Sequence, residues 1–153
     1  MTKSTSSAST TQTNTRHSGN TWVVKLNLER EVEIKQLKRK LNSYAELPYD
    51  WDGEGSQTPS RQAIDDALKF LTHIPSGLPL PYPEAGPEGD VGIYWDNQKA
   101  KTFVHVLFEG DGHFAYIANV KHTQTDLEEK YGGEALSVDD PWPTDLVKVL
   151  LHK

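Results

Sequence analysis

The sequence predicts an α+β fold in which two N-terminal helices pack on a three-stranded antiparallel meander, followed by a short C-terminal helix. Two observations support this. Before residue 75, two segments repeat apolar residues at steps of three and four, the spacing of an amphipathic helix. After residue 89, three apolar segments are joined by short turns, the pattern of consecutive antiparallel strands.

The first helix is predicted over residues 28–46, with Asn27 as its cap and Pro48 ending it. Acidic residues crowd its first turns and basic residues its last, the order that the helix dipole favours. Its apolar stripe consists of Leu28, Val32, Leu37, Leu41 and Tyr44. The preceding segment, residues 21–26, is either a short strand or an apolar lead-in to the helix. Residues 1–20 carry eleven Ser and Thr and predict a disordered tail, which leaves 21–153 as one domain.

A second helix is predicted to begin at Thr58 and Pro59, a good N-cap followed by a residue suited to the first helical position. Pro75 and Gly77 end it. Its stripe consists of Ile64, Ala67, Leu68, Leu71 and Ile74. The segment 75–89, with five prolines, reads as an extended connector.

The three strands are predicted in residues 90–96, 101–109 and 113–120. The second is apolar on both faces, so we expect it at the centre. One sheet face packs on the helices, and we expect the other to expose a binding patch or a homodimer interface. That patch consists of Phe103, Leu107 and Ile117. Residues 121–140 predict a polar loop with a short helical piece, and the apolar residues after Trp142 predict a last short helix.

The most distinctive stretch is "LPYDWDGEGSQTPS", residues 47–60, in which Asp50, Asp52 and Glu54 alternate with other residues. The spacing matches the start of a calcium-binding EF-hand loop, but Arg61 stands where that loop needs a bidentate Glu. Two nearby carboxylates also suit acid–base hydrolysis. Two alternative functions therefore remain: a domain that senses an ion or small molecule through this loop, and an acid–base hydrolase built on Asp50, Asp52 or His105.

The interpretation we favour for this stretch is structural. Gly53 and Gly55 permit positive φ angles, and the Asp side chains can accept hydrogen bonds from loop N–H groups. Trp51 anchors the loop against the core, and Arg61 pairs with one of its acids. If the loop also binds a partner, the side chains involved are Asp50, Trp51, Asp52, Glu54 and Arg61.

Metal and cofactor chemistry find little support in the sequence. The chain has no cysteine, and none of its six histidines forms the i,i+4 pair of a helical zinc site. His105 and His113 fall on adjacent predicted strands, where they could approach one another, but the sequence offers no obvious third ligand. We therefore expect no metal and no cofactor.

The charge is unevenly distributed. Residues 1–45 hold eight Lys and Arg against three acids, a formal charge of +5. Because the net charge of the chain is −6, residues 46–153 carry a formal charge of −11. An acidic body repels nucleic acid and suits a protein partner with a basic surface. No apolar run is long enough to cross a membrane, and the lack of cysteine fits a cytoplasmic location. We therefore expect a non-enzymatic protein-binding module.

Three stretches together resemble a loose family of small bacterial proteins from mobile or defence-related islands. They are "LPYDWDGEGSQTPS", "LPLPYPEAGPEGDVGIYW" and "FVHVLFEGDGHFAYIA". The resemblance covers about Leu47 to Val120 and leaves the N-terminal tail outside. It implies a partner-binding role, such as an antitoxin, an immunity protein or an anti-defence inhibitor. It supplies no catalytic residues.

Overall fold

The computed structural model describes residues 18–125 and 127–153. Its elements follow the order helix, short 3-10 helix, helix, five strands, helix. They are α2 (Ser18–Ser43), η1 (Tyr44–Glu46), α3 (Arg61–Thr72), β1 (Tyr82–Ala85), β2 (Val91–Asn97), β3 (Thr102–Phe108), β4 (His113–Lys121), β5 (Glu128–Ser137) and α4 (Thr144–Leu151). The chain divides into two units between Gln36 and Leu37, inside α2.

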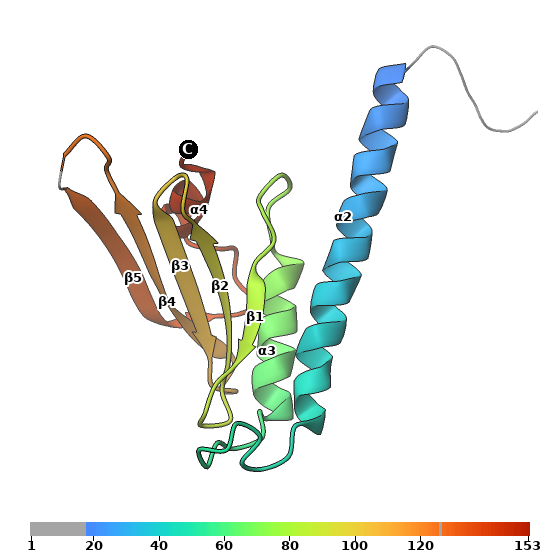
Figure 1. Ribbon diagram of the computed structural model, residues 1–153, viewed down its shortest axis with the longest axis vertical. Helices are drawn as coiled ribbons and strands as arrows, with labels where there is room; N and C mark the ends of the chain where they lie inside the picture. Colours follow the sequence, from blue (N-terminus) through green and yellow to red (C-terminus); the bar gives the residue numbers. More distant parts are fainter. Residues whose placement is uncertain (1–17, 126) are drawn as a thin grey trace, which may run out of the picture. The chain divides into compact units, whose positions relative to one another are not determined.

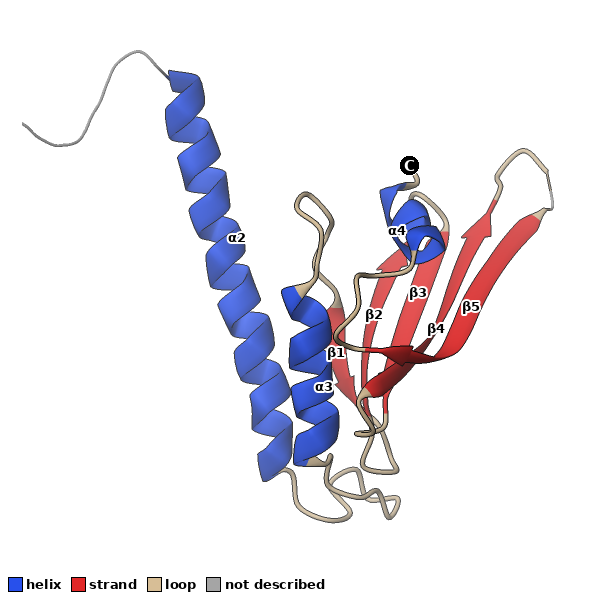
Figure 2. Cartoon of the chain, turned by 180° about the vertical axis from the view of Figure 1, so that it is seen from behind, coloured by secondary structure: helices blue, strands red, loops and turns tan. Residues whose placement is uncertain are grey.

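The α+β class is confirmed, but the predicted three-stranded meander is wrong. The sheet has five antiparallel strands in the order β1-β2-β3-β4-β5, with β3 at the centre as predicted. The prediction of two N-terminal helices as the packed layer is also wrong. The helices that contact the sheet are α3 and α4, which lie on one face of it (Figures 1 and 2).

The two missed strands are the edges of the sheet. β1 lies in the proline-rich connector, and an edge strand tolerates Pro83 because one side of it needs no ladder hydrogen bond. β5 lies in the segment predicted as a polar loop. Most of its residues are exposed, so it lacks the alternation of a half-buried strand. Both segments therefore form strands because they pair at an edge of the sheet, although their composition does not indicate a strand.

The helix boundaries also differ from the prediction. α2 begins at Ser18 rather than at residue 28, so Asn27 is inside the helix and 21–26 is helical. Residues 1–17 of the predicted tail lie outside the described residues. The cap of α3 is Ser60, whose Oγ accepts a hydrogen bond from Ala63 N at 3.0 Å. Thr58 instead donates its hydroxyl to Leu47 O at 2.6 Å, which closes the preceding loop.

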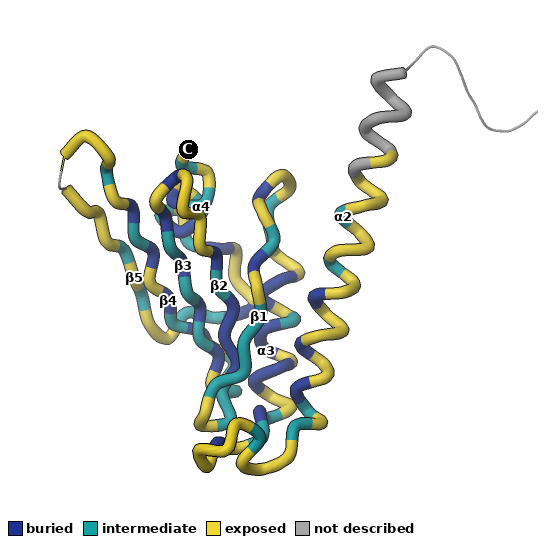
Figure 3. The backbone as a smooth tube through the Cα atoms, in the orientation of Figure 1, coloured by how far each residue is buried: buried dark blue, intermediate teal, exposed yellow. Residues whose placement is uncertain are grey.

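The hydrophobic core lies between the sheet and its two helices. Buried and less buried residues alternate along β3 and β4 (Figure 3), so one face of each strand contributes to it. Phe70 of α3 is its centre: the ring stacks on Trp142 at 4.4 Å and meets Phe114 edge-on at 4.8 Å. Leu37, Leu41 and Tyr44 join this core, whereas Leu28 and Val32 of the predicted stripe are exposed.

Candidate functional site

The loop of residues 47–60 is held by its own hydrogen bonds. Asp50 N donates to Ser56 O at 2.7 Å, and Gly53 N donates to Asp50 O at 3.0 Å. Gly53 and Gly55 have φ angles of 78° and 81°, as predicted, and Asp50 itself has a φ of 66°. A left-handed conformation at a residue other than glycine is costly and persists where surrounding contacts fix it. The loop is therefore a defined structure rather than a loose connection.

The two aspartates of this loop are used to shape it. Asp50 Oδ1 accepts a hydrogen bond from Gly55 N at 2.6 Å, and Asp52 Oδ1 accepts one from Glu54 N at 3.0 Å. The Ser56 hydroxyl donates to Asp52 Oδ2 at 2.5 Å. The Ser56 hydroxyl, and after it the Glu54 N–H, lower the pKa of Asp52 because they stabilise its ionised form. Asp52 is therefore held in its charged form while it shapes the turn.

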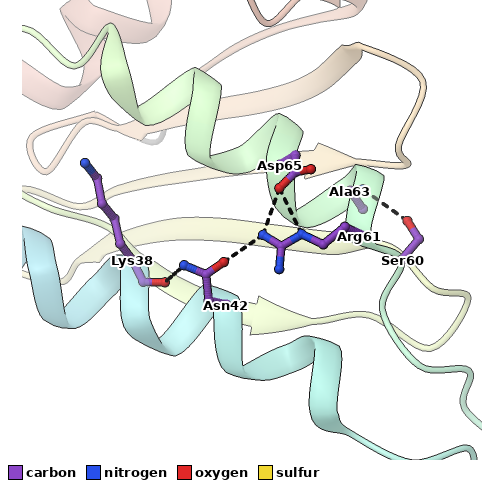
Figure 4. A network of polar contacts seen from close by, with 6 residues as sticks. All are labelled: Lys38, Asn42, Ser60, Arg61, Ala63 and Asp65. Carbon is purple, nitrogen blue, oxygen red and sulfur yellow. Dashed lines mark hydrogen bonds and ion pairs between the residues drawn. The ribbon is translucent and has the colours of Figure 1, made fainter.

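Trp51 and Arg61 behave differently from the prediction. Trp51 is partly buried and donates Nε1 to Gln57 O at 2.9 Å, so it fastens the loop to itself, outside the core cluster of the described residues. Arg61 pairs with Asp65 at 2.7 Å instead of with a loop acid. Its guanidinium also donates to Asn42 Oδ1 at 2.7 Å, which joins the end of α2 to the start of α3 (Figure 4).

Two hairpin turns meet this loop. Gln57 N donates to Pro87 O, and Ser60 N to Gly89 O, each at 2.9 Å, so the β1–β2 turn lies against the loop. The β3–β4 turn is tied to α3 by the hydrogen bond from Gly112 N to the buried Asp66 Oδ2 at 2.8 Å. Three segments that are far apart in the sequence are therefore fixed at one end of the sheet.

These three turns form a surface that we call the acidic end. None of the three segments, 47–60, 86–90 and 109–112, contains Lys or Arg. Together they carry seven carboxylates: Asp50, Asp52, Glu54, Glu88, Asp90, Glu109 and Asp111. Asp90 Oδ1 accepts from Glu88 N and Asp111 Oδ1 from His113 N, each at 3.0 Å, the same use of an aspartate as in the first loop. Every residue of this surface can be found in the sequence, but only the structure shows that they lie at the same end of the sheet.

The open face of the sheet carries the predicted patch. Phe103 and Leu107 are partly buried, and Ile117, which pairs with His105 across the strands, is 50% exposed. Tyr82 and Tyr94, paired across β1 and β2, extend this face with rings 5.6 Å apart. The homodimer through this face stays a prediction.

The open face also holds a side-chain hydrogen bond that the sequence did not reveal. His105 Nε2 lies 2.5 Å from Glu84 Oε1, although β2 runs between their strands. The pair closes over Gly92, where a Cβ would come within 3.0 Å of both groups. Burial raises the pKa of the nearby Tyr44, and the charge on Glu84 raises it further. Glu84 lies in the segment read as a connector, so only strand pairing could have identified it.

The groups of the hydrolase and metal alternatives have other partners. Asp50 and Asp52 bind loop donors and His105 binds Glu84, so the three do not form one constellation. His113 lies four residues before Ile117, the partner of His105, or about 13 Å along β4. Among residues 18–125 and 127–153, no group of three or more potential metal ligands is found.

No helix in the described residues is long and apolar enough to cross a bilayer. Comparison of the chain with models of known families, with curated proteins and with solved structures finds no match. Function is therefore inferred from the side chains and their arrangement.

Proposed function

We propose that the protein is a non-enzymatic protein-binding module whose acidic end binds a partner with a basic surface. The observation that carries the proposal is the convergence of seven carboxylates on three turns that contain no Lys or Arg. Opposite charge on two proteins steers their encounter and selects the partner. An antitoxin, an immunity protein or an anti-defence inhibitor, the roles that the resemblance implies, would act in this way.

The rigidity of the acidic end supports this role. Its four aspartates accept hydrogen bonds from backbone N–H groups, so the turns keep their shape before a partner arrives. Binding by a preformed surface avoids part of the entropic cost of ordering loops. Tyr49, in the first of these loops, is 70% exposed and offers an aromatic contact beside the charges.

The test separates the charge of the acidic end from its shape. The glutamates Glu54, Glu88 and Glu109 are exposed, and their side chains take no part in the turn hydrogen bonds described above, so they can be changed to Gln with the turns intact. The matched control changes Glu29, Glu31 and Glu33 of α2 to Gln, which removes the same charge from another part of the chain. Partners are captured from the source organism on each bait, identified by mass spectrometry and then purified for biolayer interferometry.

We expect a basic partner that binds the wild type and the α2 control and is lost, or weakened at least about tenfold, with the Glu54, Glu88 and Glu109 variant. Its association rate should fall with rising ionic strength. Equal binding of the partner to both variants would refute a role for the acidic end. A partner whose affinity does not depend on salt would do the same.

A further inference from the structure

The two edge strands of the sheet differ in length and in the backbone groups that they leave unpaired. β5 has ten residues and β1 has four. Within the described part of the chain, β5 pairs with β4 alone and β1 with β2 alone. Most residues of β5 are exposed (Figure 3). A long exposed edge offers N–H and C=O groups with which a further strand can pair.

The β1 edge is poorly suited to such pairing. Gly86 N donates to Asp90 O at 3.0 Å, so the backbone groups of Gly86 point toward β2. Backbone groups of an antiparallel strand point alternately to its two sides, so those of Pro83 and Ala85 point outward. Proline has no N–H. The outer edge of β1 therefore lacks a donor inside a strand that is already short.

The β5 edge keeps all of its outward donors. Lys121 N donates to Lys101 O at 3.0 Å, so the backbone groups of Lys121 point toward β3. Its partner on β5, Glu128, therefore lies at a position where β4 and β5 exchange no ladder hydrogen bonds. The pattern repeats at every second residue. The N–H and C=O groups of Glu128, Lys130 and Gly132 thus point away from the sheet.

A bulge ends this regular segment. The register between β4 and β5 shifts after Gly133, and Ala135 has a positive φ of 56°. A bulge bends an edge strand and interrupts its ladder. The part of β5 that can accept a further strand therefore runs from Glu128 to Glu134.

This segment is complementary to itself in one antiparallel register. When two copies pair around Gly132, outward backbone groups lie opposite outward groups, and Lys130 of each copy lies opposite Glu134 of the other. Opposite charges at directly facing positions stabilise a strand pair, and like charges destabilise it. Pairing centred on residue 128, 129, 130 or 131 places like charges opposite one another, and pairing centred on Gly133 joins no opposite charges. The charge pattern therefore favours a second copy of this chain in the register centred on Gly132.

We propose that the protein forms a homodimer in which the β5 strands of two copies pair antiparallel around Gly132 and join their sheets into one. Association ends at two copies, because the edges left outside are the two β1 strands with Pro83. This interface is separate from the open face of the sheet. It also contains none of the seven carboxylates of the acidic end, so the dimer and the binding of a basic partner can be tested independently.

Sedimentation velocity of the full chain over a series of protein concentrations measures the dimer. Lys130→Glu brings two carboxylates face to face at each contact, and Glu134→Lys brings two ammonium groups together. Each variant should weaken dimerisation by at least about tenfold. Both side chains are exposed, and circular dichroism checks the fold. A wild type that stays monomeric throughout, or single variants that dimerise as well as the wild type, would overturn the proposal.

An equimolar mixture of the two single variants separates contacts between copies from effects within one copy. Lys130 also lies 3.7 Å from Glu128 of its own chain, so a single variant changes an internal contact as well. In the mixture every repulsive pair becomes an attractive pair between unlike variants, so a heterodimer should form. The double variant Lys130→Glu with Glu134→Lys should dimerise for the same reason. Failure of the mixture to dimerise would refute the interface.

A variant of the open face is the matched control. Leu107 lies on that face, on the central strand β3, so Leu107→Gln should leave the dimer intact. Loss of the dimer in this variant, with dimerisation retained in the two charge variants, would assign it to the open face and refute pairing through β5. Hydrogen exchange gives a backbone readout: the amides of Lys130 and Gly132 should exchange more slowly as protein concentration rises, and that of Ala85 should not change. Exchange at all three amides that is independent of concentration would contradict the pairing.

Discussion

Glu84 on β1 and His105 on β3 lie 2.5 Å apart across the open face of the sheet, above Gly92 of the strand between them. The pair connects the short edge strand to the centre of the sheet without using the backbone ladder. Its side chains are 45% and 29% exposed, so its contribution to stability should be modest. The absence of a side chain at position 92 is what allows the contact.

The loss of stability caused by replacing Glu84 should depend on the absence of a side chain at Gly92. Glu84→Gln should destabilise the wild type by up to about 1 kcal/mol, the range of partly exposed ion pairs. In a Gly92→Ala background it should have almost no further effect, because the new Cβ already separates the two groups. Urea unfolding of the four proteins measures the coupling. An equal cost of Glu84→Gln in both backgrounds would show that Gly92 plays no part.

Asp66 and Asp65 are adjacent on α3, but we expect their replacement to cost different amounts of stability. Asp66→Ala should cost about 1–3 kcal/mol, because Gly112 N loses its acceptor at a buried site. Asp65→Ala removes an exposed partner of Arg61 and should cost less than about 1 kcal/mol. Hydrogen exchange at the Gly112 amide should accelerate in the first variant only. Similar stability and exchange in the two variants would contradict the assignment of Asp66 as the tie between α3 and the β3–β4 turn.

Trp142 should be among the most sensitive core positions. Its ring stacks on Phe70, and its Nε1 donates to Phe70 O at 2.8 Å. Trp142→Ala should cost about 3–5 kcal/mol, and Trp142→Phe about 1–3 kcal/mol, because Phe keeps much of the packing and loses the hydrogen bond. Trp51→Ala, at a partly buried loop position, is the control and should cost less than Trp142→Ala. The reverse order in thermal unfolding would argue against this core.

Tyr116 predicts a loss of stability in alkali. Burial raises the pKa of its hydroxyl, and the hydrogen bond to Asp145 Oδ1 raises it further. The folded protein therefore disfavours the ionised phenol, so the stability that Tyr116 contributes is complete below pH 10 and falls as the pH rises above that value. The free energy of unfolding of the wild type should fall more steeply above pH 10 than that of Tyr116→Phe. Parallel curves for the two proteins would contradict the prediction.

The sequence predicted those elements whose pattern is local. The alternation in β2, β3 and β4 can be read within a dozen residues, and the structure confirms it. The stripe predicted for α3 is confirmed at Ile64, Ala67 and Leu71, but it omitted Phe70, which is fully buried. The sequence also predicted that Gly53 and Gly55 need positive φ angles. The apolar side chains expected on the open face were identified in the same way, because successive side chains of a strand point to opposite faces.

Relationships between distant segments depended on the tertiary structure. β1 and β5 carry no clear strand pattern, and pairing with a neighbour makes them strands. Arg61 was expected to pair with a loop acid. It pairs instead with Asp65, which lies one helical turn away on the same face of α3.

The sequence by itself determined the α+β class, the three inner strands and the rigid acid-lined loop, because each follows from short-range spacing and residue chemistry. Only the tertiary structure decided which turns share an end of the sheet, and so brought the seven carboxylates of the acidic end together. Charges combine through space rather than along the chain. Their joint effect is therefore fixed only when the antiparallel order of the strands brings alternate turns together.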